Sequence, residues 1–321
     1  MQAGHVPVLL QEAIDFLNVR QGGTYLDATV GLGGHSSEIA KRLGAAGHLI
    51  GCDTDPAALA RAKRSLAGPS ITVEEKLTPG APAYEGRARA DWPSVELVHG
   101  SFADLASGLP AASTDGILAD LGLSSLQLED AARGFSFQAE GPLDMRMNPQ
   151  AELTAEQVVN RMDERKLADV IYEFGEERRS RRIARAIVRS RPIRTTAHLA
   201  EVVSAAARPM NPRERRIHPA TRTFQGLRIY INHELDDLGT LLNEASRLLK
   251  PGGRLVVISF HSLEDRMVKD ALRHGVRLGY YRLLTNKPVS VSRQEIDRNP
   301  RSRSAKLRAA EKVRERSAGI A

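Results

Sequence analysis

A carboxylate followed by a glycine-rich turn is the first arrangement in this chain whose residue types could do chemistry. An apolar stretch leads to Asp27, and Gly31, Gly33 and Gly34 then precede His35. Because glycine has no Cβ, such a turn lets backbone N–H groups approach a ligand closely. Ser36 or Ser37, which follow, can cap a helix. The stretch therefore predicts a strand, a tight loop and a helix, which together form the entrance to a nucleotide-type site.

A second acid lies at the end of the next predicted strand, at residues 48–53. Asp53 in that place can accept hydrogen bonds from both ribose hydroxyls of an adenosine ligand. The alternative is a glycine-rich turn beside a solvated Asp53. The loop does not follow the G-x-G-x-x-G pattern that a nicotinamide dinucleotide favours, so an oxidoreductase of that kind is disfavoured.

Two further side chains follow predicted strands. Phe102 comes after the strand at residues 95–98, where its ring could pack on an adenine or simply join the core. Asp120 ends the strand at residues 116–120. Because the carboxyl ends of parallel strands line one crevice, we expect Asp27, Asp53, Phe102 and Asp120 to converge there.

Composition limits the class of protein. The chain has 321 residues, of which 41% are hydrophobic and 26% charged, as in a globular protein. No run approaches the roughly 18 apolar residues of a membrane span, and the first residues do not read as a signal peptide. The single Cys52 cannot form an internal disulfide. We therefore expect a cytoplasmic protein with no membrane partner.

The nine histidines show no paired ligand spacing, which predicts no metal site.

The pattern along the chain predicts two domains. Helices are expected at residues 8–19 and from 56 onward, and most of residues 68–93 reads as a surface loop. From 129 to 220 helical patterns follow one another without clear strands, at 154–162, 183–188 and 196–207. A helix is then expected at residues 221–249, followed by a strand and by a capping box formed by Ser262 and Asp265. We assign residues 1–128 and 221–321 to a sheet domain and 129–220 to an inserted helical domain for substrate recognition.

Charge is concentrated in and beside that insert. The whole chain carries a net charge of +7, whereas residues 161–228 contain 17 basic and 8 acidic residues, a net charge of +9. A solvated helix face would explain an ordinary charge run. An excess of one sign beside a predicted site instead favours contact with phosphates. The tail at residues 293–316 carries +5 and could add a strand near residues 305–309, contact RNA, or do both.

Eight stretches, which together span nearly the whole chain, carry a resemblance to a known family: 5–10, 27–35, 120–127, 133–137, 141–147, 218–225, 259–266 and 299–304. They resemble the motifs of the bacterial 16S ribosomal RNA cytosine-N(4) methyltransferases, the RsmH (MraW) family. The turn at 251–253, between a predicted helix and a predicted strand, is also similar to that of class I S-adenosylmethionine methyltransferases. Two departures from the family are a longer loop at 68–93 and Leu126 in place of a proline.

The resemblance implies an α/β fold, a Rossmann-like class I S-adenosylmethionine-dependent methyltransferase domain with an inserted all-helical domain. It implies N(4)-methylation of cytosine 1402 in the decoding region, with 16S ribosomal RNA in the small ribosomal subunit as the partner. The oligomeric state stays open, a homo-oligomer included. The resemblance implies S-adenosyl-L-methionine as the cofactor, with contacts at Gly33, Gly34, His35, Asp53, Phe102, Asp120 and Gln127. The strand and glycine-turn pattern adds Asp27 and Gly31 to these predicted contacts. The basic excess of residues 161–228 predicts RNA contacts at Arg178, Arg179, Arg182 and Arg222.

The reaction itself limits the catalytic residues. A cytosine amine is a poor nucleophile because its lone pair is delocalised, so the enzyme must orient it and accept a proton. Asp120 is the candidate acceptor or orienter, although it could instead bind only the amino group of the cofactor. Ser124 and Ser125 are candidates to position the base edge. Cys52 lies within a strand on the cofactor side, which disfavours a covalent intermediate at a ring carbon.

Two questions remain open from the sequence. Phe135, Phe137 and Met145 could provide a stacking platform for a flipped base, but core packing is the favoured role of each. A different class of protein also fits the basic insert. This would be an RNA-binding ribosome assembly factor that uses cofactor occupancy as a checkpoint, and methyl turnover distinguishes it from an enzyme.

Overall fold

The computed structural model describes residues 7–67, 82–86, 90–207 and 218–313. By packing, the chain divides into two compact units. The first comprises Met1–Gly122 and Asp236–Ala321, and the second comprises Leu123–Leu235. Each unit is described by itself. No helix in the described ranges is long and apolar enough to cross a membrane.

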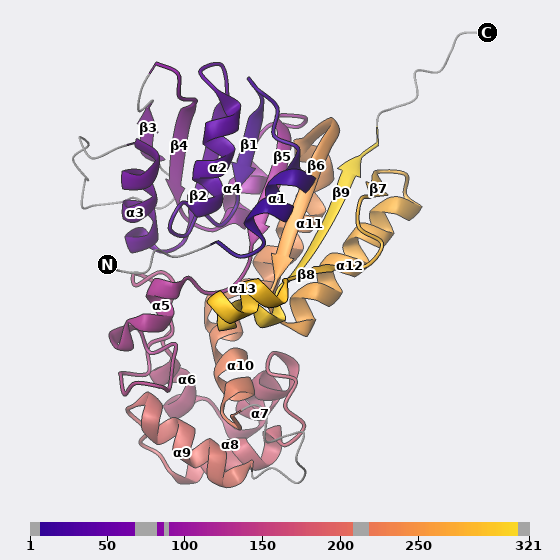
Figure 1. Cartoon of the computed structure of the whole chain (residues 1–321). Helices are drawn as coiled ribbons and strands as arrows, with labels where there is room; N and C mark the ends of the chain where they lie inside the picture. The colour runs from indigo at the N-terminus through magenta and orange to yellow at the C-terminus, as the bar shows by residue number, and fades with distance from the viewer. Residues whose placement is uncertain (1–6, 68–81, 87–89, 208–217, 314–321) are drawn as a thin grey trace. The chain divides into compact units, whose positions relative to one another are not determined.

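A mixed sheet forms the centre of the first unit (Figure 1). Its strand order is β3-β4-β2-β1-β5-β6-β9-β7, and β8 pairs with β9. The strands from β4 to β6 in this order run parallel, whereas β3, β7, β8 and β9 are antiparallel to their neighbours. Their bounds are β1 Thr24–Asp27, β2 His48–Asp53, β3 Pro82–Gly86, β4 Ser94–His99, β5 Thr114–Asp120, β6 Leu249–Ser259, β7 Tyr281–Leu283, β8 Val289–Ser290 and β9 Lys306–Lys312.

Strand order places a switch point between β1 and β5. From β1 the chain winds outward through β2 and β4, and it then returns to β5 on the other side of β1. Ligands of open α/β sheets bind at the carboxyl ends of the strands at such a point. Asp27 and Asp120 are the last residues of these two strands. The predicted parallel α/β sheet is therefore confirmed, and it places both acids at the expected edge.

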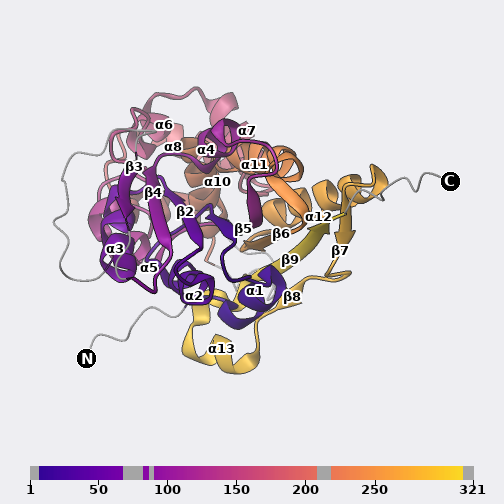
Figure 2. The same cartoon turned by 90° about the horizontal axis from the view of Figure 1, so that it is seen from above.

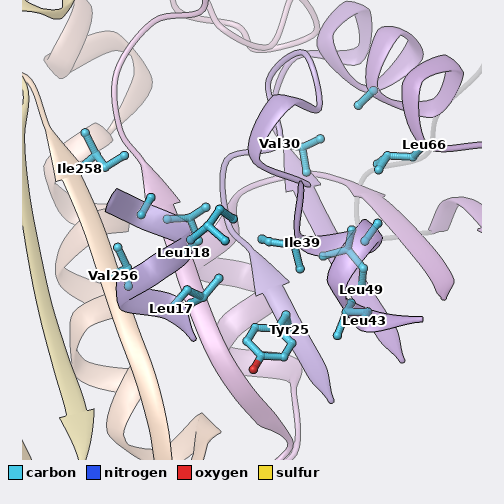
Figure 3. Close-up of a cluster of buried hydrophobic side chains, with 14 of the residues drawn as sticks. Leu17, Tyr25, Val30, Ile39, Leu43, Leu49, Leu66, Leu118, Val256 and Ile258 are labelled. Atoms are coloured by element: carbon cyan, nitrogen blue, oxygen red, sulfur yellow. The ribbon is translucent and has the colours of Figure 1, made fainter. Parts of the chain in front are cut away.

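Helices cover both faces of this sheet (Figure 2). The first face carries α1 Leu10–Leu17, α2 Gly34–Leu43 and α3 Pro56–Ala67. The second carries α4 Phe102–Gly108, α11 Glu234–Leu248 and α12 Ser262–Arg277. Successive strand residues alternate between the two layers. Val256 and Ile258 pack toward α1–α3, as Figure 3 shows, whereas Leu255 and Val257 pack toward the other helices.

The C-terminal segment completes the first unit. After α12 it forms β7 and β8, then α13 Arg293–Arg298 and the 3-10 helix η3 Pro300–Ser304, and finally β9. The strand predicted near residues 305–309 is thus confirmed. Lys306 and Arg308 of β9 contact the carboxylate of Asp265 at 3.0 Å and 2.7 Å. The tail is therefore tied to α12 by ion pairs as well as to β6 by the strand ladder.

The second unit is helical in its described part. It contains α5 Ser125–Glu129, η1 Ala131–Arg133, α6 Ala155–Arg161, α7 Glu164–Glu173, α8 Ser180–Arg189, α9 Thr196–Ala206 and α10 Thr221–Asn232. Thr154 caps α6 as predicted, whereas α7 was not predicted. By packing, this unit comprises residues 123–235, whereas the predicted insert comprises residues 129–220. Phe224 and Leu227 of α10 belong to its core, so α10 packs with this unit. Its role in substrate recognition stays a prediction.

Several expected element ends differ in the structure. Helix α2 begins at Gly34 with Gly33 as its N-cap, because the Ser36 hydroxyl donates to Asp27 instead of capping. The cap of α12 is His261 with Glu264, not Ser262 with Asp265. The helix expected from 221 to 249 is divided at His233, which has a φ of 53°.

The expected loop at 68–93 is also only partly right. Residues 82–86 form β3 and pair with β4. Residues 68–81 and 87–89 lie outside the described residues.

A glycine contact in the second unit provides a test of this packing. A Cβ on Gly175 would lie 2.4 Å from the carbonyl oxygen of Arg222 and 2.6 Å from that of Ile171. Gly175→Ala should therefore lower the free energy of unfolding by about 1–3 kcal/mol, because backbone must move to admit the methyl group.

Urea denaturation followed by circular dichroism measures this change. Gly108→Ala is the matched control, since a Cβ there meets nothing within 4 Å. It should leave stability unchanged or raise it by up to about 1 kcal/mol. Equal stabilities of the two variants would contradict the described contact of α7 with α10.

Candidate functional site

The buried side chain of Asp27 holds the glycine loop through hydrogen bonds. Its side chain is fully buried, and its carboxylate accepts the backbone N–H of Thr29 at 3.2 Å and the hydroxyl of Ser36. Burial raises the pKa of Asp27 to about 6, and these two hydrogen bonds partly oppose the increase. Asp27 therefore acts in the structure as the internal anchor of the loop. Its contact with a cofactor stays a prediction.

Asp53 connects the end of β2 to the same loop. One carboxylate oxygen accepts the N–H of Gly31 at 2.8 Å, and the other accepts the N–H of Asp55 at 2.8 Å. Burial raises the pKa of Asp53 to about 6. A carboxylate oxygen accepts more than one hydrogen bond, so both oxygens retain capacity for ribose hydroxyls.

Backbone conformation or close packing favours glycine at three positions of the loop. Gly31 and Gly33 have φ values of 52° and 80°, in the left-handed region that favours glycine. A Cβ on Gly33 would lie 3.2 Å from Cα of Ala62 in α3. On Gly34 it would lie 2.2 Å from Cγ of Pro7. Helix α3 and the segment before α1 therefore pack directly against the loop backbone.

Asp120 supplies an acceptor without a partner. Its backbone N–H donates to the hydroxyl of Thr29 at 2.6 Å, which ties β5 to the loop. Its Oδ2 lies 3.6 Å from Nδ1 of His35. Its Oδ1 is buried and makes no hydrogen bond in the structure. Burial raises the pKa of Asp120 well above its usual range, and the charge of Asp27 adds to the increase. Such an atom fits an N–H group of a ligand.

Phe102 and Cys52 occupy the neighbouring strand ends. Phe102 begins α4, is half-buried and packs against the core of the second face. The thiol of Cys52 is buried and donates to the carbonyl of Gly100 at 3.1 Å. Burial raises the pKa of that thiol well above its usual range, and nearby acids add to the effect. Cys52 is thus held as an unreactive thiol, because only the thiolate is nucleophilic.

The structure brings most of the predicted residues of the first unit together. Thr29 contacts both Asp27 and Asp120, and His35 lies 3.6 Å from Asp120. Asp53 accepts the N–H of Gly31 in the same loop. Phe102 follows β4 in the same sheet. Within the described residues, no group of three or more His, Cys, Asp or Glu side chains could hold a metal ion.

Three of the residues predicted for catalysis or cofactor binding belong to the second unit. Ser124 caps α5, and its N–H donates to Oε1 of Gln127 at 2.9 Å while its hydroxyl accepts the N–H of Gln127 at 3.3 Å. Gln127 is buried. The structure thus gives Ser124 and Gln127 a capping role in α5. The parts assigned to Ser124, Ser125 and Gln127 in binding or catalysis stay predictions.

Sequence reasoning missed two contributors to the loop. Thr29 bridges Asp27 and Asp120 through its N–H and hydroxyl. Its place between the strand and the glycines is the signal that could have identified it. The carbonyl of Val8 lies 3.1 Å from Nε2 of His35. No side-chain pattern reveals this contact, because a distant backbone atom makes it.

The arginines predicted to bind RNA lie on neighbouring segments of the second unit. Arg178 and Arg182 are exposed, and Arg179 is half-buried. Arg222 is exposed on α10 and donates to the carbonyl of Glu176 at 3.4 Å. Packing of α10 against α7 thus brings Arg222 beside the segment that precedes α8.

One aromatic pair in the second unit is partly exposed. The rings of Phe137 and His218 stack with centroids 4.5 Å apart and planes inclined by 29°. Phe224 supports Phe137 edge-on at 5.0 Å. His218 is exposed, whereas Phe135 and Met145 are buried in the core. Phe135 and Met145 therefore pack in the core, and the exposed ring of the group is that of His218.

A glycine loop, acids at three strand ends and a switch point between β1 and β5 define a class I S-adenosylmethionine-dependent methyltransferase domain. Comparison with known families agrees with this class. The model of the MraW methylase family matches residues 2–313. The chain belongs to the MraW methylase family.

Relatives named ribosomal RNA small subunit methyltransferase H match over nearly their whole length. The protein of Koribacter versatilis is 66% identical over 309 residues, which cover 96% of this chain and 94% of the relative. That of Acidobacterium capsulatum is 59% identical, with 96% and 98% covered. That of Synechococcus elongatus is 48% identical, with 96% and 95% covered.

The cofactor of this methylase is S-adenosyl-L-methionine, and the observed groups fit it. The carboxylate of Asp53 suits the ribose hydroxyls, and the glycine backbone admits close approach. The unpartnered oxygen of Asp120 suits an amine. These assignments to individual cofactor groups remain expectations that binding measurements can test.

The raised pKa of Asp53 predicts pH-dependent cofactor binding. Below about pH 6 the free protein holds this carboxyl protonated. Ribose hydroxyls donate best to the ionised form, so affinity should rise as pH increases from about 5 to 7 and then level off. Asp53→Asn should bind more weakly at pH 7 and lose most of this dependence.

Isothermal titration with S-adenosylmethionine across this pH range measures the effect. Asp104→Asn is the control, because Asp104 is an exposed acid on the nearby helix α4. It should keep both the affinity and its pH dependence. An unchanged pH profile in Asp53→Asn would remove Asp53 as the titrating ligand.

Proposed function

We propose that this protein transfers a methyl group from S-adenosylmethionine to N4 of cytosine 1402 in the decoding region of 16S ribosomal RNA. The observation that carries this proposal is the buried, unpartnered Oδ1 of Asp120 beside the cofactor loop. The names of the close relatives support small-subunit ribosomal RNA as the substrate. That substrate also favours a cytoplasmic location.

The chemistry requires an acceptor of this kind. When bound, S-adenosylmethionine supplies an activated methyl group. The amine nitrogen forms a bond to this methyl as the bond from methyl to sulfur breaks, and the electron pair of that bond goes to sulfur. The nitrogen then releases a proton. Asp120 takes that proton at Oδ1, or orients the amine before transfer. Because Cys52 is held as a buried thiol, it is not available to form a covalent intermediate with the base.

The second unit supplies groups suited to RNA. Its arginines at 178, 182 and 222 are exposed and can contact phosphates. The stacked pair of Phe137 and His218 presents an aromatic ring in a fixed orientation, which suits stacking of an unpaired base. Phosphate contacts position the RNA, while the aromatic ring holds a base.

Methyl transfer tests the proposed function directly. Labelled S-adenosylmethionine is incubated with small ribosomal subunits that lack this modification, and the labelled nucleoside is then identified. N(4)-methylcytidine at position 1402 is the expected product. Cofactor binding without any transfer to RNA would favour the assembly-checkpoint function and overturn the proposal.

The same assay separates the two roles of Asp120. If Asp120 accepts or orients the amine, Asp120→Asn should reduce kcat by about 10²-fold or more while the Kd of the cofactor changes little. A large rise in that Kd with kcat preserved would assign Asp120 to the amino group of the cofactor instead.

Arginine substitutions test the RNA surface. The double variant Arg178→Ala with Arg222→Ala should weaken binding to small subunits and lower the slope of log K against log salt by about 2, roughly 1 for each phosphate contact. Filter binding at several salt concentrations measures both quantities. The charge-matched control is Arg273→Ala with Arg277→Ala on α12, where both residues are exposed. Equal losses in the two double variants would indicate general charge attraction and contradict a specific surface.

A further inference from the structure

The side chain of His35 lies between two oxygen acceptors. Nε2 is 3.1 Å from the carbonyl oxygen of Val8, and Nδ1 is 3.6 Å from Oδ2 of Asp120. A carbonyl oxygen can only accept, so Nε2 carries the hydrogen. A neutral ring would then direct the Nδ1 lone pair at a carboxylate. The two groups repel each other unless one proton lies on Nδ1 or on Oδ2.

We propose that His35 and Asp120 act as an ion pair across 3.6 Å, in which this one proton lies on either partner. His35 is then a positioning residue that keeps Oδ1 of Asp120 ready to receive the proton of the cytosine amine. This inference rests on the proposed function of Asp120 as the acceptor. It assigns the side chain of His35 a part in proton handling, in addition to its predicted place in the cofactor loop.

The charges around Asp120 explain the need for a basic partner. Asp27 on β1, Glu264 on α12 and Glu295 on α13 all act on it with negative charge. Together with burial, these acids favour the protonated carboxyl, which cannot accept a proton. An imidazolium at His35 opposes them from α2. The pair can therefore hold Asp120 ionised inside a buried, acidic surrounding.

The segment before α1 fixes the orientation of the ring. The N–H of Leu9 donates to Oε1 of Glu295 at 2.9 Å, and Leu9 has a φ of 52°. Pro7 packs on the backbone of Gly34, next to His35. Residues near the two ends of the chain thus hold the Val8 carbonyl where it binds Nε2. The ring then presents Nδ1, and not Nε2, to Asp120.

Proton balance follows from this arrangement. The resting pair holds one proton beyond that on Nε2. As the nitrogen–carbon bond forms and the sulfur–carbon bond breaks, the proton of the amine passes to Oδ1. The pair then holds two protons and releases one to solvent before the next turnover. Protonation of Oδ1 before reaction prevents transfer, so kcat should fall on the acid side of its pH profile.

Two substitutions of His35 distinguish a positioning role from a packing role. His35→Gln keeps a donor for Val8 but removes the group that faces Asp120. It should lower kcat at pH 7 by about tenfold and move the acid limb of the kcat profile up by about one pH unit. His35→Asn places an amide donor near Nδ1 and should recover part of both changes. The KM of S-adenosylmethionine should change less than kcat.

His99 supplies the matched control. It is also buried, and its Nε2 lies 3.1 Å from the carbonyl of Thr54, but its Nδ1 makes no hydrogen bond in the structure. His99→Gln should leave the acid limb in place. If His35→Gln behaves like this control, or if His35→Asn restores nothing, the positioning role is overturned.

A spectroscopic measurement tests the pair without turnover. In ¹⁵N-histidine NMR of the full chain without RNA, the His35 signals are identified by their loss in His35→Asn. They should show hydrogen on Nε2, and Asp120→Asn should move their titration midpoint to lower pH by about one unit. Hydrogen on Nδ1 alone, or no movement, overturns the pair. If the wild type instead makes no N(4)-methylcytidine while this shift is present, the proposed function fails and the ion pair stands.

Discussion

Burial of carboxylates at one edge of a parallel sheet is the constraint on which this structure depends. Asp27, Asp53 and Asp120 end β1, β2 and β5, where a carboxylate lies away from bulk water. A buried charge is costly unless it is hydrogen-bonded or paired. Asp27 accepts hydrogen bonds from the N–H of Thr29 and the hydroxyl of Ser36, and Asp53 accepts one from an N–H of the glycine loop. The third keeps one oxygen without a donor, and this is where chemistry can occur.

The rest of the first unit serves to hold that edge in place. Alternation of apolar residues along β6 lets helices cover both faces of the sheet, so the strand ends are fixed by packing on two sides. The C-terminal segment adds β9 beside β6 and supplies Glu295, which binds the backbone next to Val8. The segment at 7–9 therefore contacts both α13 and the cofactor loop.

The second unit has its own physical basis. Its core is formed by apolar residues from α6 to α10, and Gly175 and Gly226 let α7 and α10 approach closely. Arg178, Arg182 and Arg222 remain at the surface because the free energy of hydration of a guanidinium is large. A basic helical surface with one exposed, stacked ring is well suited to nucleic acid, whose phosphates and bases require these two kinds of contact. The family of the chain and the names of its relatives agree with such a substrate.

The sequence by itself determined the elements whose signals are local. The strands that end in Asp27, Asp53 and Asp120, the cap at Thr154 and the final strand were all predictable, since periodicity and capping depend on nearby residues. Tertiary structure decided what depends on distant partners. The hydroxyl of Ser36 donates to Asp27 instead of capping α2, and the ring of His35 lies between Val8 and Asp120. No local pattern encodes these contacts, because donor and acceptor lie far apart in the sequence and meet only when the chain packs. Burial also removes the water that would otherwise compete for each acceptor.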